Sequence, residues 1–305
     1  MAERRPIRWH VAVFLAPAVL VYTAVMIVPL FGTLQLALYR SAEGVAEFVG
    51  LANFRTLFGD PRWSASFWNA LGNNFWFFLV HMIVQNPVGI LLAALLSSPR
   101  LRFAAVYRSA IFVPTILSFV IVGFVWKLIL SPLWGIAPTL LDAVGLRSLF
   151  APYLGREEYA LTTLGFISVW QWFGIPMMLS YAAMLAIPEE ILEAAEIDGI
   201  TGVSQFFKIK LPLLWPTIGV IAILTFVSNF NSFDLIYTAQ GALAGPNFST
   251  DILGTLLYRT FFGAQLQLGD PNMGAAIATM MLLIILAVVC AYLFFVQRKL
   301  VRYQL

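Results

Sequence analysis

The sequence predicts an all-α integral membrane protein with six transmembrane helices and both termini in the cytoplasm. The composition supports this prediction, because the 305 residues are 61% hydrophobic and only 11% charged. A soluble domain carries about 25% charged residues, so most of this chain is expected to lie in a bilayer. Two further observations, six long apolar stretches and an uneven distribution of basic residues between alternate loops, predict the number of spans and their orientation.

Six stretches are long and apolar enough to form transmembrane helices. A helix needs about 20 mostly apolar residues to cross about 30 Å of hydrocarbon. The predicted spans are Val11–Tyr39, Phe75–Leu96, Val106–Leu130, Leu161–Leu185, Leu213–Tyr237 and Ala275–Val296. We expect them to form a single transmembrane domain over residues 1–305, with no soluble domain at either end.

Two other apolar stretches contain charges and are expected to lie along the membrane surface. Leu133–Phe150 contains Asp142 and Arg147. Ile252–Leu266 is short and centred on Arg259. An amphipathic helix with such charges is stable at the interface, where its polar face stays in water. The sequence therefore predicts two interfacial helices.

Arginine and lysine near the span ends predict the orientation, because cytoplasmic loops carry an excess of both. With six spans, the termini and the loops after the second and fourth spans share one side. That side holds eleven basic residues, which are Arg4, Arg5, Arg8, Arg100, Arg102, Arg108, Lys208, Lys210, Arg298, Lys299 and Arg302. The opposite side holds six, which are Arg40, Arg55, Arg62, Arg147, Arg156 and Arg259. The termini and the loop after the fourth span are therefore predicted to be cytoplasmic.

No sequence pattern predicts an enzymatic site. The chain contains no G-x-x-x-x-G-K-[ST] phosphate-binding loop and no H-E-x-x-H, C-x-x-C or G-x-S-x-G sequence. Its two histidines, His10 and His81, are isolated, and a histidine inside an apolar span is more typical of hydrogen-bonded packing than of metal binding. Cys290 is the single cysteine, which excludes an intrachain disulfide. We expect no catalytic residue, metal or cofactor on this chain.

One predicted cytoplasmic segment, residues 187–212, is charged and helix-forming between two apolar spans. Glu189, Glu193 and Glu196 lie at i, i+4 and i+7, so they share one helix face, and Gly199 is suited to the helix end. Like charges at this spacing cost a few tenths of a kcal/mol per pair. This cost favours a basic partner for the acidic face. The alternative is that the charges only keep a loop solvated.

The spacing in this segment resembles the EAA signature of bacterial ABC-importer membrane subunits, which is E-A-A, three residues, G, nine residues, I-x-L-P. The matching residues are Glu193, Ala194, Ala195, Gly199, Ile209, Leu211 and Pro212, with Asp198 before the glycine. The resemblance implies the type I ABC importer transmembrane fold and a coupling helix that docks on a separate ATP-binding subunit, which holds ATP and magnesium. The coupling residues that it implies are Glu193, Ala194, Ala195, Asp198 and Gly199, with Glu193 making the ionic contact.

Other stretches resemble the carbohydrate branch of these importers, the maltose- and glycerol-3-phosphate-permease type. They are FVGLANFRTLFGDPRWSASFWNALGNNFWF (48–77), RSAIFVPTILS (108–118), NFNSFDLIYTAQGALAGPNFSTDIL (229–253) and GAAIATMMLLI at the start of the sixth span. GALAGP replaces the usual GGP, and the short end QRKLVRYQL is similar to the first, maltose-permease-F-like member of a permease pair. The resemblance implies a bacterial inner-membrane heterodimer with a second permease. It also implies two ATP-binding subunits and a periplasmic or lipid-anchored sugar-binding protein.

Polar and aromatic residues in the fourth and fifth spans are candidates for a substrate pathway. Polar groups inside a membrane are costly and usually face a bundle interior or a water-filled cavity. The candidates are Thr225, Asn229, Phe230, Ser232 and Phe233 in the fifth span and Gln171 and Trp172 in the fourth. Their amides and hydroxyls suit sugar hydroxyls, and their rings suit apolar sugar faces. The alternative is that these polar groups hydrogen-bond the helices to one another.

An ion-coupled secondary transporter is the main alternative function. Such a carrier would need intramembrane carboxylates paired with bases, or an inverted repeat between its halves. Asp234 is the only acidic residue within the predicted spans, and it lies near the outer end of the fifth. The sequence therefore favours the ATP-driven permease.

Overall fold

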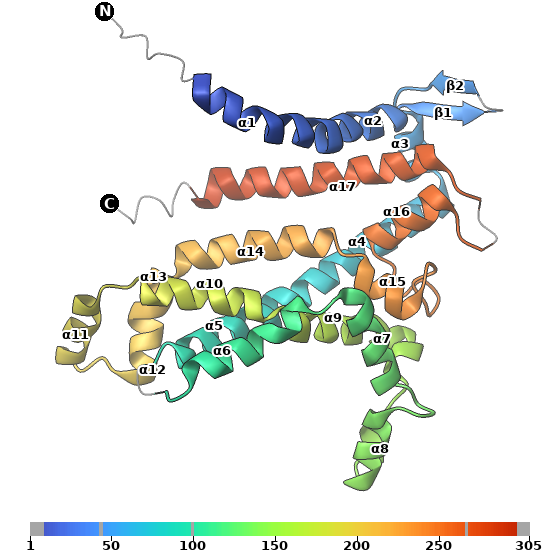
Figure 1. Ribbon diagram of the computed structural model, residues 1–305. Coiled ribbons are helices and arrows are strands. Elements are labelled where there is room, and N and C mark those ends of the chain that lie inside the picture. The colour runs from blue at the N-terminus through green and yellow to red at the C-terminus, as the bar shows by residue number, and fades with distance from the viewer. Residues whose placement is uncertain (1–8, 43–44, 99–100, 266–267, 298–305) are drawn as a thin grey trace, which may run out of the picture.

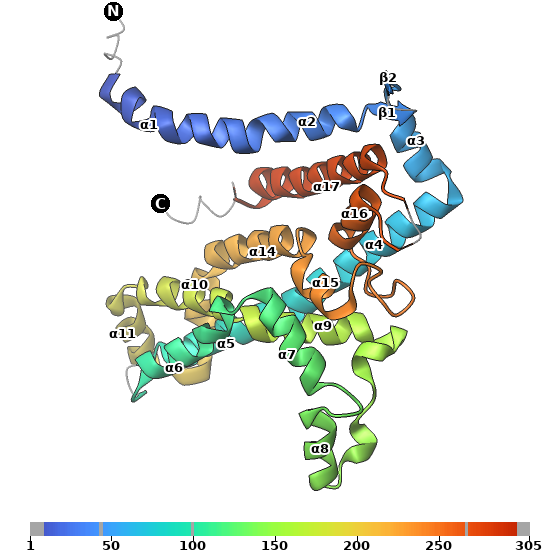
Figure 2. The same cartoon turned by 45° about the vertical axis from the view of Figure 1, so that its right-hand side comes forward.

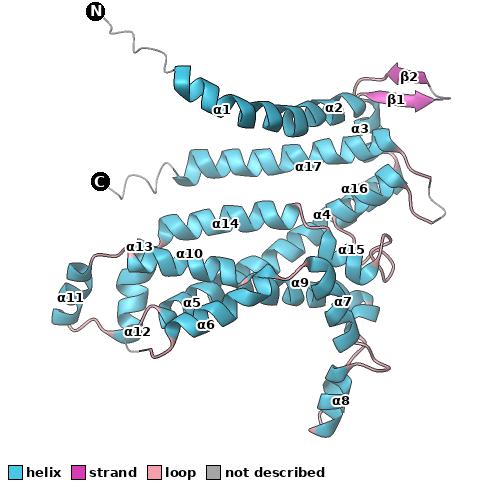
Figure 3. Cartoon of the chain, viewed as in Figure 1, coloured by secondary structure: helices cyan, strands magenta, loops and turns pink. Residues whose placement is uncertain are grey.

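The computed structural model describes residues 9–42, 45–98, 101–265 and 268–297, and these are mostly helical (Figures 1 and 3). In the described part of the chain the strands form one antiparallel hairpin of β1 (Tyr39–Ala42) and β2 (Val45–Phe48). The predicted all-α membrane fold is confirmed.

Three continuous helical segments are long and apolar enough to cross a membrane. They are Val13–Leu36, with α1 (Trp9–Tyr22) and α2 (Val28–Leu36); Pro61–Leu96, with α4 (Pro61–Val80) and α5 (Asn86–Leu96); and Pro271–Gln297, with α17 (Pro271–Ala291). The second of these begins at Pro61 rather than at Phe75, because the Asp60 side chain caps the helix by accepting hydrogen bonds from the N–H groups of Arg62 and Trp63.

Three further segments reach the length of a span only as bent pairs, which brings the candidates to six. In the first pair, Ala104–Ile116, which includes α6 (Ala104–Phe112), turns by 95° into α7 (Phe119–Ile129). In the second, α10 (Gly174–Leu185) turns by 77° into α11 (Glu189–Ile197). In the third, Gly202–Leu213, which includes α12 (Gly202–Gln205) and α13 (Leu211–Leu213), turns by 69° into α14 (Trp215–Phe230). The stretch predicted as one span over Leu213–Tyr237 is also interrupted. It divides into α14 and α15 (Asp234–Gln240), because the Asn231 side chain donates to the Val227 carbonyl and closes the last turn of α14.

Four further helices lie outside these segments. They are α3 (Ala52–Gly59), α8 (Ile136–Ala143), α9 (Glu157–Trp172) and α16 (Leu253–Phe262). Of the stretch 133–150, predicted as one interfacial helix, only α8 and a short turn are helical, and α8 projects away from the bundle in both views (Figures 1 and 2). By contrast, α16 packs inside the bundle, where Leu256 shares a core with Phe67 of α4, Phe226 of α14 and Ile277 of α17.

Three wide π-helical turns share a sequence cause. Each ends two residues before a proline, and they are Thr23–Ile27 before Pro29, His81–Gln85 before Pro87 and Phe206–Lys210 before Pro212. A proline inside a helix lacks an N–H, and its ring clashes with the carbonyl four residues earlier. A wider turn, closed for example by the bond from the Asn86 N–H to the His81 carbonyl, relieves that clash. Such turns often occur at functional sites.

The molecule has two distinct ends. α11 and α12 lie at one end with the start of α1 and the end of α17, and we call it the α11 end (Figures 1 and 2). The β1–β2 hairpin, α3 and α16 lie at the opposite end, the hairpin end. Arg102, Arg108, Lys208 and Lys210, predicted to be cytoplasmic, belong to segments at the α11 end, whereas Arg4, Arg5, Arg8, Arg100, Arg298, Lys299 and Arg302 lie outside the described residues.

Candidate functional site

The predicted coupling residues lie on α11 and on the turn that ends it. Gly199 adopts a left-handed conformation, with φ of +75°. Its N–H donates to the Glu196 carbonyl at 3.0 Å, and the Ile200 N–H donates to the Ala195 carbonyl at 2.8 Å. This pair of bonds is the Schellman cap, in which glycine is favoured because it has no Cβ. Gly199 therefore forms the corner after α11.

Most of the predicted coupling residues face outward. Those exposed are Glu193, Ala194, Asp198 and Gly199, whereas Ala195 is buried. Within the described part of the chain the one ion pair joins Arg259 to Asp251, so the carboxylates of α11 have no cationic partner there. Ile197, which is 87% exposed, and Val203, which is 74% exposed, add apolar surface beside them. This surface combines unpaired acids with exposed aliphatic side chains.

The α11 helix lies in the chain between α10 and the segment that leads to α14. It follows α10 after a 77° bend, and the segment Gly202–Leu213 leads from it to α14. The buried Gln205 side chain donates to the Leu192 carbonyl of α11 at 3.4 Å. α11 is therefore connected to α10 directly and to α14 through α12.

A cavity of about 420 Å³ lies among the π-helical turn His81–Gln85, α7, α9, α10, α14 and the start of α15. Five of the residues predicted for the substrate pathway line it, and they are Trp172, Thr225, Asn229, Ser232 and Phe233. Gly89 lets α5 approach α10 beside the cavity, because an added Cβ would lie 2.8 Å from the ring of Pro176, which itself lines the cavity.

Two predicted pathway residues lie elsewhere. Gln171 is fully buried, and its side-chain amide donates to the Leu117 carbonyl at 2.8 Å, which joins α9 to the bend before α7. Phe230 packs on Phe226 with ring centroids 4.2 Å apart, in the core that α14 shares with α16 and α17. Each of these two residues is adjacent in sequence to a residue that lines the cavity. Because consecutive side chains point in different directions around a helix, Gln171 and Phe230 point away from the cavity.

The cavity residues that the sequence analysis did not assign to the pathway include His81, Gln85, Phe119 and Ser168. The signal for His81 and Gln85 was the proline at 87, which places both in a π-helical turn. The signal for Ser168 was its position four residues before Trp172, on the same helix face. Phe119 carried no such signal, because its place depends on the 95° bend before α7.

Aromatic rings form part of the cavity wall. Phe119 and Trp172 stack with ring centroids 5.5 Å apart and an interplanar angle of 28°. Phe233 stacks on Tyr237 at 4.9 Å. The cavity therefore combines amide and hydroxyl groups with flat apolar surfaces.

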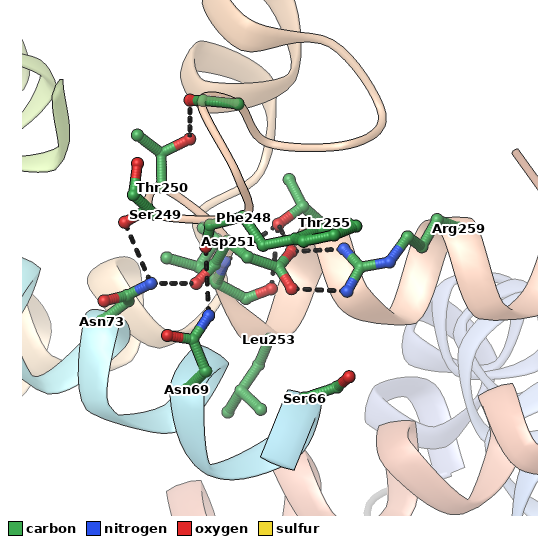
Figure 4. Close-up of polar contacts among 12 residues, drawn as sticks. Ser66, Asn69, Asn73, Phe248, Ser249, Thr250, Asp251, Leu253, Thr255 and Arg259 are labelled. Carbon is green, nitrogen blue, oxygen red and sulfur yellow. Dashed lines mark hydrogen bonds and ion pairs between the residues drawn. The ribbon is translucent and has the colours of Figure 1, made fainter. Parts of the chain in front are cut away.

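A buried ion pair holds the loop between α15 and α16 (Figure 4). The Arg259 guanidinium donates to both carboxylate oxygens of Asp251 at 2.6 Å, and the two side chains are 5% and 1% exposed. Burial raises the pKa of Asp251, whereas the hydrogen bonds and charge of Arg259, together with the Thr255 hydroxyl, lower it. The prediction of an interfacial helix around Arg259 is therefore wrong, because pairing with Asp251 allows this arginine to enter the bundle.

Side-chain amides of α4 donate hydrogen bonds to the same loop. Asn69 donates to the Phe248 carbonyl at 3.0 Å and Asn73 donates to the Asp251 carbonyl at 2.8 Å, as Figure 4 shows. The buried Asn74 donates to a carbonyl at the end of α14 and accepts from an N–H at the start of α16. Asn69 and Asn73 thus anchor the loop to α4, and Asn74 joins α4 to α14 and to the start of α16.

The described residues contain no group of three or more His, Cys, Asp and Glu that could hold a metal ion. His81 bonds the Phe77 carbonyl and the Ser168 hydroxyl, as a packed histidine does.

Comparison with known proteins identifies the family. The pattern of the family described as binding-protein-dependent transport system inner membrane component matches residues 85–302. The chain is 32% identical to the probable ABC transporter permease protein YurN of Bacillus subtilis, over 90% of this chain and 91% of that protein. It is 28% identical to the arabinooligosaccharides transport system permease protein AraP of Bacillus subtilis, over 90% and 84%. It is 30% identical to the lactose transport system permease protein LacF of Rhizobium radiobacter, over 82% of each chain.

Solved structures show the same fold. A chain of a bacterial ABC transporter involved in the import of the acidic polysaccharide alginate superposes with a TM-score of 0.78 at 21% identity, over 95% of this chain and 96% of that chain. These findings favour the permease over the secondary transporter and confirm its likeness to the carbohydrate branch. The chain belongs to the family of binding-protein-dependent transport system inner membrane components, and it is a multi-pass ABC transporter permease.

Proposed function

We propose that this chain is the sugar-translocating permease of an ATP-driven importer and forms half of its pathway with a second permease. In this assembly two separate ATP-binding subunits hydrolyse ATP, and a periplasmic or lipid-anchored protein delivers the sugar. The observation that carries the proposal is the exposed acidic face of α11, whose carboxylates have no partner among the described residues. The relatives named as lactose and arabinooligosaccharide permeases support the substrate class.

The coupling residues form the surface on which the ATP-binding subunit docks. Glu193 supplies the ionic contact, and Ala194 permits close approach because its side chain is small. Ala195 packs α11 onto the rest of the loop, whereas Asp198 and Gly199 form the corner that fixes the direction of α12. Exposed Ile197 adds apolar contact, because the buried core of a protein–protein interface is rich in apolar surface.

The cavity serves as the sugar site of this subunit. Thr225, Asn229 and Ser232 bond sugar hydroxyls, while Trp172 and Phe233 stack on the apolar face of the ring. When ATP draws the two coupling helices together, α10 and α14 move with α11 and open the cavity toward the hairpin end, where the delivery protein docks. Hydrolysis of ATP reverses this movement, so that the cavity opens toward the α11 end.

The direct test is purification of the tagged chain from detergent-solubilised membranes of its host. We expect a second permease and an ATP-binding subunit to co-purify. The ATPase activity of the eluate should rise with one sugar-loaded binding protein and not with the unloaded protein. A chain that elutes without an ATP-binding subunit would contradict the proposal.

Glu193→Lys provides the internal comparison for this purification. The substitution reverses the charge at the proposed ionic contact, so recovery of the ATP-binding subunit should fall. Glu157→Lys, at the start of α9, makes the same chemical change on an exposed residue away from α11 and should leave recovery unchanged. Equal recovery of the ATP-binding subunit with both variants would show that Glu193 does not make the contact.

A further inference from the structure

The α8 helix leaves the bundle in a direction of its own. Both views show it nearer the hairpin end than the α11 end, and running across the direction of the spanning helices α1, α14 and α17 (Figures 1 and 2). The membrane normal follows the spanning helices, so the axis of α8 lies close to the membrane plane. Because the α11 end carries the predicted cytoplasmic bases, α8 belongs to the outer half of the molecule.

A compact turn fixes how α8 follows α7. The Gly135 N–H donates to the Ser131 carbonyl at 2.9 Å, and the Thr139 hydroxyl donates to the Gly135 carbonyl at 3.0 Å. An added Cβ at Gly135 would clash with the carbonyl oxygens of Ile129 and Ser131, so the chain can approach itself this closely only at a glycine. The direction of α8 is therefore set by local contacts within this chain.

One face of α8 is apolar and is not covered by the rest of the described chain. Ile136 and Leu140 lie one turn apart, Val144 follows one turn later, and all three are exposed. Leu133 and Trp134, immediately before the helix, are 84% and 78% exposed. Burial of a large apolar side chain is worth about 1.5–3 kcal/mol, so this face favours an apolar environment outside the chain.

The opposite side of α8 is polar. Asp142 is six residues after Ile136 and two after Leu140, which places it on the other side of the helix. Asp142 and Arg147, which follows the helix, are exposed, and neither belongs to the one ion pair of the described residues. A charge without a counter-charge is costly to remove from water. This side of the helix therefore faces water.

The headgroup layer of a bilayer provides both environments at once. An amphipathic helix in the membrane plane buries its apolar face about 5–10 Å into the boundary between headgroups and acyl chains and keeps its polar face wet. Trp134 suits the same level, because tryptophan is enriched at membrane–water interfaces. Exposed apolar side chains also continue along one face of the preceding helix α7, at Ile121, Phe124 and Leu128. A lipid surface thus accounts for the direction of α8 and for both of its faces.

We propose that α8 is an interfacial helix that binds the headgroup layer of the outer leaflet, with Trp134, Ile136, Leu140 and Val144 toward the acyl chains. The interfacial helix predicted over residues 133–150 is thereby restricted to α8 and the turn before it. The same contact ties α7, which carries Phe119 of the cavity wall, to the membrane surface. The inference goes beyond the proposed transport function and does not depend on it.

The test is electron paramagnetic resonance of spin labels on α8, in liposomes that contain the chain with the subunits that co-purify with it. Cys290→Ser removes the single cysteine of the chain, and its labelled sample supplies the background from the other subunits. Leu140→Cys and Asp142→Cys, each added to Cys290→Ser, then place one label on each side of α8. Accessibility of the label to oxygen, which concentrates in lipid, and to a water-soluble nickel complex gives its depth.

We expect the Leu140→Cys label to lie about 5–10 Å below the lipid phosphates and the Asp142→Cys label to lie at their level or above it. Equal depths, or a Leu140→Cys label that the nickel complex reaches readily, would overturn the proposal, because α8 would then stand in water. A Leu140→Cys label that neither reagent reaches would also overturn it, because a protein subunit would then cover the apolar face.

A charge on the apolar face tests what holds α8 in place. With the label carried by Ile136→Cys, Leu140→Asp should move that label toward water by about 5 Å, since a carboxylate is costly among acyl chains. Ser148→Asp adds the same charge at an exposed position beyond α8 and should leave the depth unchanged. An unchanged depth in Leu140→Asp would contradict the proposal.

Discussion

Replacement of Gly199 by proline is expected to lower ATP-dependent transport at least about tenfold, because proline fixes φ near −65° and costs about 3 kcal/mol where that value cannot be met. The native φ is +75°, and the glycine N–H that proline removes donates to the Glu196 carbonyl. An added Cβ would meet no atom within 4 Å, so the effect is on the backbone rather than on packing. Membrane insertion should be retained, since α11 lies at one end of the molecule. The measurement is ATPase activity and uptake in reconstituted liposomes.

The chain supplies a matched control for this variant. Gly145 ends α8 with the same Schellman cap: its φ is +72°, its N–H donates to the Asp142 carbonyl, and the Leu146 N–H donates to the Leu141 carbonyl. Gly145→Pro therefore imposes the same backbone conflict on a helix outside the coupling segment, and transport should be kept. Similar losses in both variants would show that general destabilisation, not lost coupling, explains the result at Gly199.

Replacement of Arg259 by leucine is expected to destabilise the chain by about 3–5 kcal/mol, because it leaves the buried Asp251 carboxylate without its counter-charge. Thermal unfolding of the purified chain in detergent measures this loss. Arg62→Leu is the control, since Arg62 lines the same surface pocket as Asp251 and Arg259 but is itself exposed. Its cost should stay below about 0.5 kcal/mol. A similar loss in both variants would contradict a special role for the ion pair.

The pH dependence of Arg259→Leu gives a second readout. In this variant the burial that raises the Asp251 pKa is no longer opposed by Arg259. A carboxyl whose folded pKa is raised binds its proton more tightly in the folded state, so stability is greatest below the unfolded pKa and declines as pH rises through the folded pKa. The loss of stability of Arg259→Leu relative to the native chain should therefore be smallest at low pH. Replacing Asp251 by leucine in the same chain should recover most of the loss.

The helix and the glycine corner of residues 187–212 could be predicted from the sequence because their signal is local. A helix with acids at i, i+4 and i+7 and a glycine at its end needs no tertiary information, and Gly199 occupies the predicted corner. The alternation of apolar and polar stretches likewise predicted the membrane fold. The bends were harder to predict from the sequence, since the 95° turn before α7 depends on packing as well as on Pro114.

The cavity was predicted only in part, because it depends on helix rotation. Thr225 and Asn229 share a helix face, as their spacing predicts, and both line the cavity. Gln171 instead bonds the bend before α7, and Phe230 packs in the core. Arg259 shows the second limit of pattern reasoning. Its charge indicated a surface helix, and only the distant contact with Asp251 explains its burial.

The measurement that tests the central claim most directly is uptake of a labelled neutral disaccharide into liposomes that contain the purified assembly and its binding protein. We predict uptake only when ATP is present on the α11 side and the ATP-binding subunits are retained. Uptake by this chain alone, driven by a proton or sodium gradient without ATP, would contradict the assignment as an ATP-driven permease.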